Sequence, residues 1–194
     1  MALLGAIPTA HGAIVYSGLQ NIAIPYTFSG VYVNIQTLGT SFNQPADFDT
    51  SPWLNLDFGG VDISNGVLIT PIVIGVGLDQ VSNLSGGSTV GPAGIFASGP
   101  NASTSHLGPA VDQFQSNTPG YIGFSFNASP AGPTNYGWMR ISINDSGTGN
   151  GTVHDWAYED VASTSLPAGV PEPTGLALIL WGISSVLLRR ARAS

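Results

Sequence analysis

Short apolar runs that alternate with polar residues, separated by clusters of turn residues, fill most of residues 13–162. A period of two is typical of strands that bury one face, and no long stretch here combines helical period with helix-forming residues. The pattern predicts an all-β domain, which we expect to be an antiparallel, jelly-roll-like β-sandwich. The expected strands are Ala13–Tyr16, Ile22–Ile24, Val31–Asn34, Trp53–Phe58, Val61–Ser64, Val67–Pro71, Gly94–Ala97, Gly120–Phe126, Tyr136–Asn144 and Thr152–Glu159.

The last two expected strands show the clearest alternation. Met139 and Ile141 share one face of the first of them, and Trp138 and Arg140 share the other. A Gly-rich segment between the two strands is long enough for an antiparallel hairpin. Because Arg140 is the one Lys or Arg before residue 170, we expect it to pair across the hairpin with a nearby acid. The candidates are Asp155, Glu159 and Asp160.

The pattern changes at the C-terminus, where residues 174–188 are uncharged and mostly apolar. As a helix they would span about 22 Å, somewhat less than the ~30 Å hydrocarbon core of a bilayer. A buried core helix is the alternative for an apolar run this short. The run is apolar on every face, follows two prolines and precedes an arginine cluster, so we predict a single membrane helix over 174–188. Arg189, Arg190 and Arg192 would stop transfer and stay cytoplasmic, which leaves the body outside.

Pro171, Glu172 and Pro173, the apolar run and the terminal arginines together resemble the PEP-CTERM sorting signal of exported bacterial proteins. The resemblance covers residues 170–194 and implies recognition by an exosortase, a membrane-embedded protease. It also implies cleavage near the Pro-Glu-Pro motif and delivery to the cell surface or the exopolysaccharide matrix. Tyr136–Ile143 and Thr152–Asp160 resemble a terminal hairpin of such proteins, which are usually thought to be β-sandwiches.

The ends of the chain set the expected domain boundaries. We interpret residues 1–12 as the remnant of a signal peptide with a small-residue site at Ala10-His11-Gly12, although a buried first strand is the alternative. The β domain is expected over residues 13–162, and residues 163–169 are expected to form a spacer before the sorting signal. The chain would then be exported and held briefly in the inner membrane.

Composition and charge narrow the function classes. The 194-residue chain has a net charge of −7, no cysteine, and four Arg against eleven acids. Disulfides and thiolate metal sites are excluded, and nucleic-acid binding, which needs a basic footprint, is disfavoured. Three of the four Arg follow residue 170, whereas ten of the eleven acids precede it. This asymmetry suggests two parts in different electrostatic surroundings.

Four acids stand close together in the sequence: Asp47, Asp49, Asp57 and Asp62. Carboxylate oxygens could hold Ca²⁺, and a pair of them could serve a glycoside hydrolase, but a solvated acidic loop fits equally well. His154 beside Asp155 could act as a base toward a distant serine, although ordinary strand residues are the simpler interpretation. No pair of histidines has metal-ligand spacing, so we expect no metal and no cofactor.

Aromatic side chains could stack on sugar rings if they were exposed, but most are expected to fill the core of a sandwich. Those in question are Trp53, Trp138, Trp156, Tyr121, Tyr136 and Tyr158. The resulting expectation is a non-enzymatic, structural or adhesive protein of the cell surface or matrix. The alternatives are a carbohydrate-binding module for exopolysaccharide and a secreted glycoside hydrolase.

Overall fold

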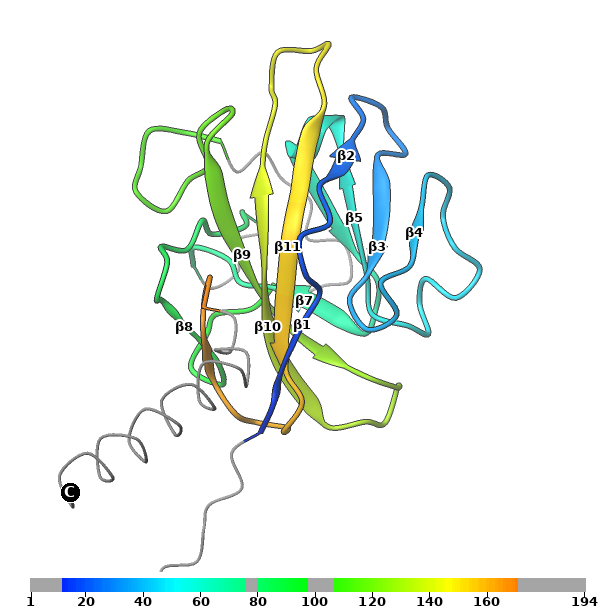
Figure 1. Ribbon diagram of the computed structural model, residues 1–194, viewed down its shortest axis with the longest axis vertical. Helices are drawn as coiled ribbons and strands as arrows, with labels where there is room; N and C mark the ends of the chain where they lie inside the picture. Colours follow the sequence, from blue (N-terminus) through cyan, green and yellow to red (C-terminus); the bar gives the residue numbers. More distant parts are fainter. Residues whose placement is uncertain (1–11, 76–79, 98–106, 171–194) are drawn as a thin grey trace, which may run out of the picture.

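The computed structural model describes residues 12–75, 80–97 and 107–170, which fold as antiparallel β-strands (Figure 1). The described residues contain no α-helix and one short 3-10 turn, Phe58–Gly60. The all-β prediction is therefore confirmed. The strands are β1 (Ile14–Tyr16), β2 (Ile22–Ile24), β3 (Val31–Asn34), β4 (Thr40–Ser41), β5 (Trp53–Asp57), β6 (Asp62–Asn65), β7 (Ile69–Pro71), β8 (Thr89–Val90), β9 (Pro119–Asn127), β10 (Thr134–Ser142), β11 (Gly151–Glu159) and β12 (Leu166–Pro167).

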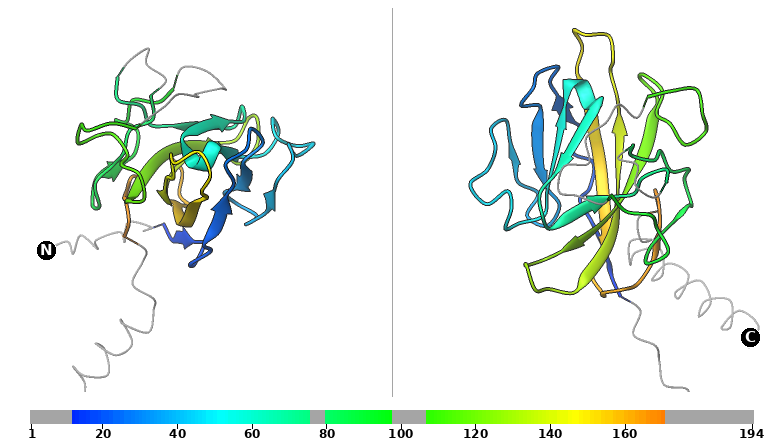
Figure 2. Two further views of the ribbon diagram at one scale, coloured as in Figure 1. Left: turned by 90° about the horizontal axis from the view of Figure 1, so that it is seen from above. Right: turned by 180° about the vertical axis from the view of Figure 1, so that it is seen from behind.

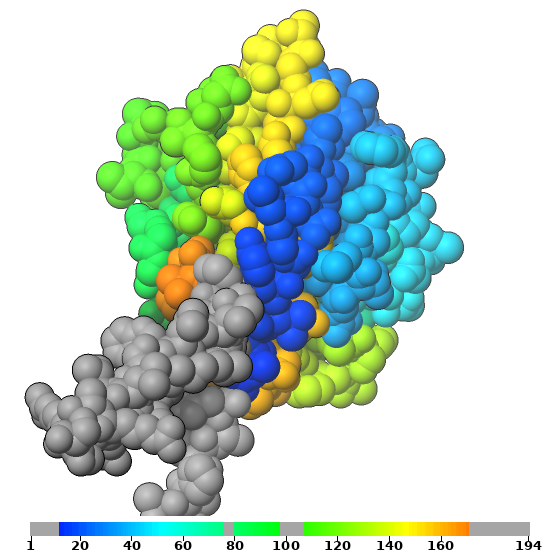
Figure 3. Space-filling model, in the orientation of Figure 1, coloured from blue at the N-terminus to red at the C-terminus, as the bar shows by residue number. Residues whose placement is uncertain are grey.

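The larger sheet has six strands in the order β1-β11-β10-β9-β7, and β2 pairs with the other end of β11. Its centre is the meander of the long strands β9, β10 and β11, in which Met139 lies opposite Ile122 and Trp156. The predicted hairpin between residues 136 and 159 is confirmed. The N-terminal strands β1 and β2 pair along the edge of β11, and in the space-filling view the N-terminal segment lies alongside these C-terminal strands (Figure 3).

The smaller sheet has four strands in the order β4-β3-β5-β6. Val31 and Val33 of β3 pair with Leu56 and Leu54 of β5, and all four side chains are fully buried. Because neighbouring side chains on a strand point to opposite faces, the residues between them point away from this apolar layer. Those residues carry the site described below.

One hydrophobic core joins the two sheets, which lie beside each other in all three views (Figures 1 and 2). It combines Val33 and Leu54 of the smaller sheet with Phe124, Met139 and Trp156 of the larger one. The Trp156 indole Nε1 donates a hydrogen bond of 2.9 Å to the carbonyl of Ile35, just after β3. This bond satisfies the one polar group of a buried tryptophan and links the sheets.

The predicted spacer over residues 163–169 is wrong, because this segment is part of the folded domain. Leu166–Pro167 forms β12, which pairs with β8, and the two segments lie side by side in Figure 1. Leu166 and Ala168 are buried in a second cluster with Val90 and Trp138. The apolar side chains of this Pro- and Ser-containing stretch thus cover the outer face of the larger sheet.

Other strand predictions differ in detail. The expected strand Gly94–Ala97 is reduced to an isolated bridge between Phe96 and Ile72. Strands β4, β8 and β12 were not predicted, since each is only two residues long and has no period to detect. The expected strand Val67–Pro71 begins two residues later, at Ile69.

The predictions for the two ends fall outside the described residues. They concern the signal-peptide remnant in residues 1–12, of which only Gly12 is described, and the sorting segment from residue 171 onward. Pro171, Glu172, Pro173, the predicted helix 174–188 and the arginines Arg189, Arg190 and Arg192 all belong to that segment. Within the part of the chain that the structure describes, no helix is long and apolar enough to cross a bilayer.

Candidate functional site: an acidic pocket on the smaller sheet

The hairpin of β5 and β6 places four polar side chains on the face of the smaller sheet that points away from the core. Asn55 lies opposite Ser64, and Asp57 lies opposite Asp62. Side chains directly opposite each other on antiparallel strands have Cβ atoms about 4.5–5.5 Å apart. The two pairs therefore form a compact square of oxygen-bearing groups, and two carboxyl groups face each other at the end of the hairpin.

A tight turn brings these strands together. Gly59 and Gly60 follow β5 with φ angles of 71° and 89°, a region that glycine enters without a steric penalty. A Cβ atom on Gly59 would come within 2.3 Å of the carbonyl oxygen of Asn144. The Gly-Gly pair thus allows both the reversal and its close contact with the larger sheet.

The square of polar groups forms the floor of a pocket of about 360 Å³. Aromatic side chains wall it: Tyr32 comes from β3, Phe48 from the β4–β5 loop, Phe28 from the β2–β3 loop and Phe58 from the turn. Tyr32 and Phe48 meet edge to face with ring centroids 5.5 Å apart. This volume and this mixture of apolar walls with a few converging polar groups are typical of small-ligand sites.

Two oxygens on the pocket floor are buried without a hydrogen-bond partner. They are Oδ1 of Asn55 and Oδ1 of Asp57, and each residue is 6% exposed. Burial, followed by the neighbouring charge of Asp62, raises the pKa of Asp57 from its usual 3.8 to about 7, against a smaller lowering by a backbone hydrogen bond. Burial also raises the pKa of Tyr32, and the charge of Asp57 adds to that shift. The pocket floor is therefore electronegative, and two of its oxygens lack hydrogen-bond partners.

The four acids predicted as a cluster separate into two groups. Asp57 and Asp62 line the pocket, whereas Asp47 and Asp49 are exposed in the loop before β5 and do not line it. The nearby polar groups of Ser51 and, to a smaller extent, Trp53 lower the pKa of Asp47. Among the described residues, no three acidic or histidine side chains gather in one place. A cation here would thus need amide or hydroxyl oxygens in addition to the two carboxylates.

Two exposed aromatic rings pack against Phe58, and one of them, Phe28, lines the pocket. Phe28 is 80% exposed and Tyr26 is 38% exposed. Both meet Phe58 edge to face, with centroid distances of 6.1 Å and 5.8 Å and interplanar angles of 72° and 68°. These two rings therefore do not lie flat beside Phe58, and Phe28 and Phe58 together form an aromatic rim on the pocket.

This rim was not predicted from the sequence, where six other aromatic residues were the candidates for sugar stacking. Trp53, Trp138, Trp156 and Tyr136 are all at least nine-tenths buried, and Tyr121 and Tyr158 are partly buried against the core clusters. The expectation that most of them fill the core is confirmed. The signal that could have found Phe28 is its position in a loop between Pro25 and Gly30, where no strand can bury it.

A second polar cluster lies on the outer face of the larger sheet. The Arg140 guanidinium donates two hydrogen bonds to the Asp155 carboxylate, at 3.0 Å and 2.6 Å, and the Tyr16 hydroxyl donates a third at 2.8 Å. Asp155 is one of the three acids predicted as the partner of Arg140. The carboxylate is 5% exposed, so this bidentate pair is largely shielded from water.

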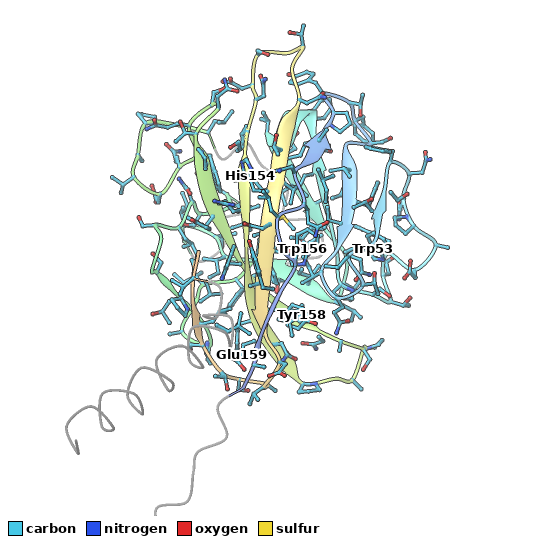
Figure 4. All side chains as sticks on the ribbon, viewed as in Figure 1. Trp53, His154, Trp156, Tyr158 and Glu159 are labelled. Atoms are coloured by element: carbon cyan, nitrogen blue, oxygen red, sulfur yellow. The ribbon has the colours of Figure 1, made fainter. Side chains whose placement is uncertain are left out.

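A β-bulge places His154 beside this ion pair. Arg140 lies opposite Asp155 but Ile141 lies opposite Val153, so His154 is the extra residue on β11 (Figure 4). Its Nε2 lies 2.8 Å from the Ser142 Oγ, and its Nδ1 lies 3.4 Å from the Asn21 Oδ1. Burial, followed by the charge of Arg140, lowers the pKa of His154.

The serine that His154 contacts is thus Ser142, on the adjacent strand. His154 does not hydrogen-bond the neighbouring Asp155, whose partners are Arg140 and Tyr16. Neither cavity described in this domain is lined by Ser142 or His154. We interpret the pair as a cross-strand hydrogen bond that fixes the bulge, and we place the candidate site in the pocket on the smaller sheet.

Compared with known proteins, the chain matches no family model, no curated protein and no solved structure.

Proposed function

We propose that the chain is an exported protein of the cell surface or extracellular matrix, sorted through a C-terminal PEP-CTERM signal. The observation that carries this proposal is the order of features after the domain: Pro171, Glu172, Pro173, the uncharged run 174–188, and three arginines. Apolar transfer inserts the run into the inner membrane, and the arginines orient it. The body, a β-sandwich of jelly-roll-like type, serves a structural or adhesive role without catalysis.

The motif is suited to a protease of the exosortase type. Proline fixes its own φ and disfavours helix in the residue before it, so the sequence favours extended backbone at Glu172, between Pro171 and Pro173. Strand β12 ends at Pro167, four positions before Pro171. A fully extended chain of that length spans roughly 14 Å, so the processing enzyme would act close to the folded domain.

Glu172→Ala tests this sorting step. In a host with an exosortase, we expect the wild-type chain to lose its C-terminal segment and reach the surface or the medium. The variant should accumulate uncleaved in the inner-membrane fraction, because the carboxylate that the protease reads is absent. Asp112→Ala, an acid of the folded domain, serves as the control and should mature normally. Equal maturation of the Glu172 variant and the wild type would overturn the proposal.

A second candidate is a carbohydrate-binding module, and the aromatic rim over the acidic pocket favours it. Carboxylate and amide groups such as Asp62 and Gln44 can hydrogen-bond sugar hydroxyls, while exposed rings such as Phe28 cover the apolar face of a sugar. Since the rings surround a hollow, the pocket suits a chain end or a single residue of a polymer better than a long flat stretch.

A glycan array probed with the full chain separates this candidate from a passive structural role. We expect Phe28→Ala to reduce binding at least tenfold while the fold is kept, because the ring is exposed. Phe42→Ala, another exposed ring that does not line the pocket, is the matched control. Absence of binding to any glycan would leave the structural role, and release of sugar from a bound glycan would instead indicate a hydrolase using Asp57 and Asp62.

A further inference from the structure

The pocket on the smaller sheet brings two carboxyl groups together without any positive charge. Asp57 and Asp62 are direct partners across β5 and β6. Of the four arginines in the sequence, Arg140 is the one within the described residues, and its Nε and Nη2 donate to Asp155 on the other sheet. Two acids that face each other in a partly desolvated site repel unless one is protonated or a cation lies between them.

Buried oxygens that lack a hydrogen-bond partner favour a bound cation over protonation of one acid. Oδ1 of Asn55 and Oδ1 of Asp57 are buried and accept no hydrogen bond, although both residues line the pocket. An unpaired buried acceptor loses its hydrogen bonds to water without replacement, so native proteins rarely leave two of them side by side. Protonation of Asp57 would remove the repulsion and supply a single O–H donor, whereas a cation can contact both unpartnered oxygens and the Asp62 carboxylate at once.

The donor set matches a hard divalent cation. Asp57 and Asp62 supply carboxylate oxygens, Asn55 supplies an amide oxygen and Ser64 supplies a hydroxyl, all on one face of the hairpin. Oxygen-only ligation by carboxylates and amides suits Ca²⁺, which accepts six to eight ligands in irregular geometry and can complete its shell with water. Mg²⁺ demands a near-ideal octahedron and is less suited to a site built on a pleated sheet.

We propose that the pocket binds Ca²⁺ through Asp57, Asp62, Asn55 and Ser64. The bound ion offsets the repulsion between the two carboxylates and gives the buried oxygens a partner. It also ties β5 to β6 next to the Phe58–Gly60 turn, so it stabilises the end of the smaller sheet. This assignment stands apart from the sorting proposal and from carbohydrate binding, and it holds whether or not either is correct.

Calorimetric titration of the full chain with CaCl₂ in mild detergent tests the assignment. We expect one ion per chain with a dissociation constant of about 10⁻⁴–10⁻³ M, the range of extracellular modules, and weaker binding of Mg²⁺. Asp57→Asn and Asp62→Asn should each weaken Ca²⁺ binding at least tenfold. Asp49→Asn removes a nearby exposed acid that does not line the pocket, and it should bind as the wild type does.

Loss of affinity is assigned to the site only for variants that keep the wild-type far-ultraviolet spectrum. Asp57→Asn is expected to fold, because it removes a charge that burial disfavours. The proposal is overturned if the wild type shows neither heat nor a rise in melting temperature at about 10 mM CaCl₂, well above the expected dissociation constant. Equal weakening by Asp49→Asn would also overturn it, since binding would then reflect general negative charge.

Discussion

At the residue scale, the burial of Asp57 is the main electrostatic feature of the domain. Burial and the facing Asp62 favour its protonated form, whereas Asp155 has its charge met by two hydrogen bonds from Arg140 and one from Tyr16. The groups that face Asp57 are Asp62 on β6 and Tyr32 on β3, and neither supplies a positive charge. The surroundings of Asp155 thus stabilise its carboxylate, whereas those of Asp57 do not.

The raised pKa of Asp57 predicts how stability changes with pH. The folded-state pKa of about 7 exceeds the usual 3.8, so folding favours the protonated acid. This contribution is fully present below about pH 4 and is lost as the pH rises toward 7. We expect the free energy of unfolding to fall by an amount on the order of 2–4 kcal/mol over this pH range. Asp57→Asn should remove this fall. Denaturant unfolding without Ca²⁺ at several pH values measures it, and an unchanged pH profile in the variant would contradict the assignment.

Some residue-level features follow from the sequence and others do not. The sequence narrows the partner of Arg140 to three acids, because the two strands of the hairpin bring only nearby acids within its range. Which of these acids lies opposite Arg140 depends on the strand register, which the bulge at His154 changes. The pairing of Asp57 with Asp62 depends on a tight turn of four residues, and the sequence could not show which of the four neighbouring acids would meet. Phe28 was not predicted because it lies in the β2–β3 loop, where the alternation of a strand gives no information on burial.

At the element scale, the length of a strand decides whether its alternation of apolar and polar residues can be recognised in the sequence. Strands β9, β10 and β11 are nine residues long, and their alternation located each of them to within two residues. Two-residue strands such as β8 and β12 have no such period. Their position depends on tertiary contacts, since Leu166 and Ala168 find their apolar surroundings on the outer face of the larger sheet.

The β12 segment offers a direct test of its role in the fold. Leu166 is 2% exposed, so Leu166→Ala should destabilise the domain by roughly 2–4 kcal/mol through lost burial and the cavity left behind. Leu19 is 63% exposed, and Leu19→Ala should change the free energy of unfolding by no more than about 0.5 kcal/mol. Thermal or denaturant unfolding of both variants provides the comparison. Similar stability for the two variants would mean that residues 163–169 form the loose spacer first expected.

At the scale of the whole molecule, the charge distribution matches the proposed route. Ten of eleven acids lie before residue 170 and three of four arginines lie after it, so the domain and the C-terminal segment have opposite net charge. In the proposed route the positive end would stay on the cytoplasmic side of the membrane, which would place the domain outside, where Ca²⁺ is plentiful. This charge distribution is consistent with the proposed export.

Peptide mass spectrometry of the protein recovered from the surface and medium of an exosortase-positive host tests this account most directly. We expect peptides that cover the domain through β12, a new C-terminus at or near Pro171–Pro173, and no peptides from residues 174–194. Recovery of an intact C-terminus ending at Ser194 in the exported fraction would contradict it.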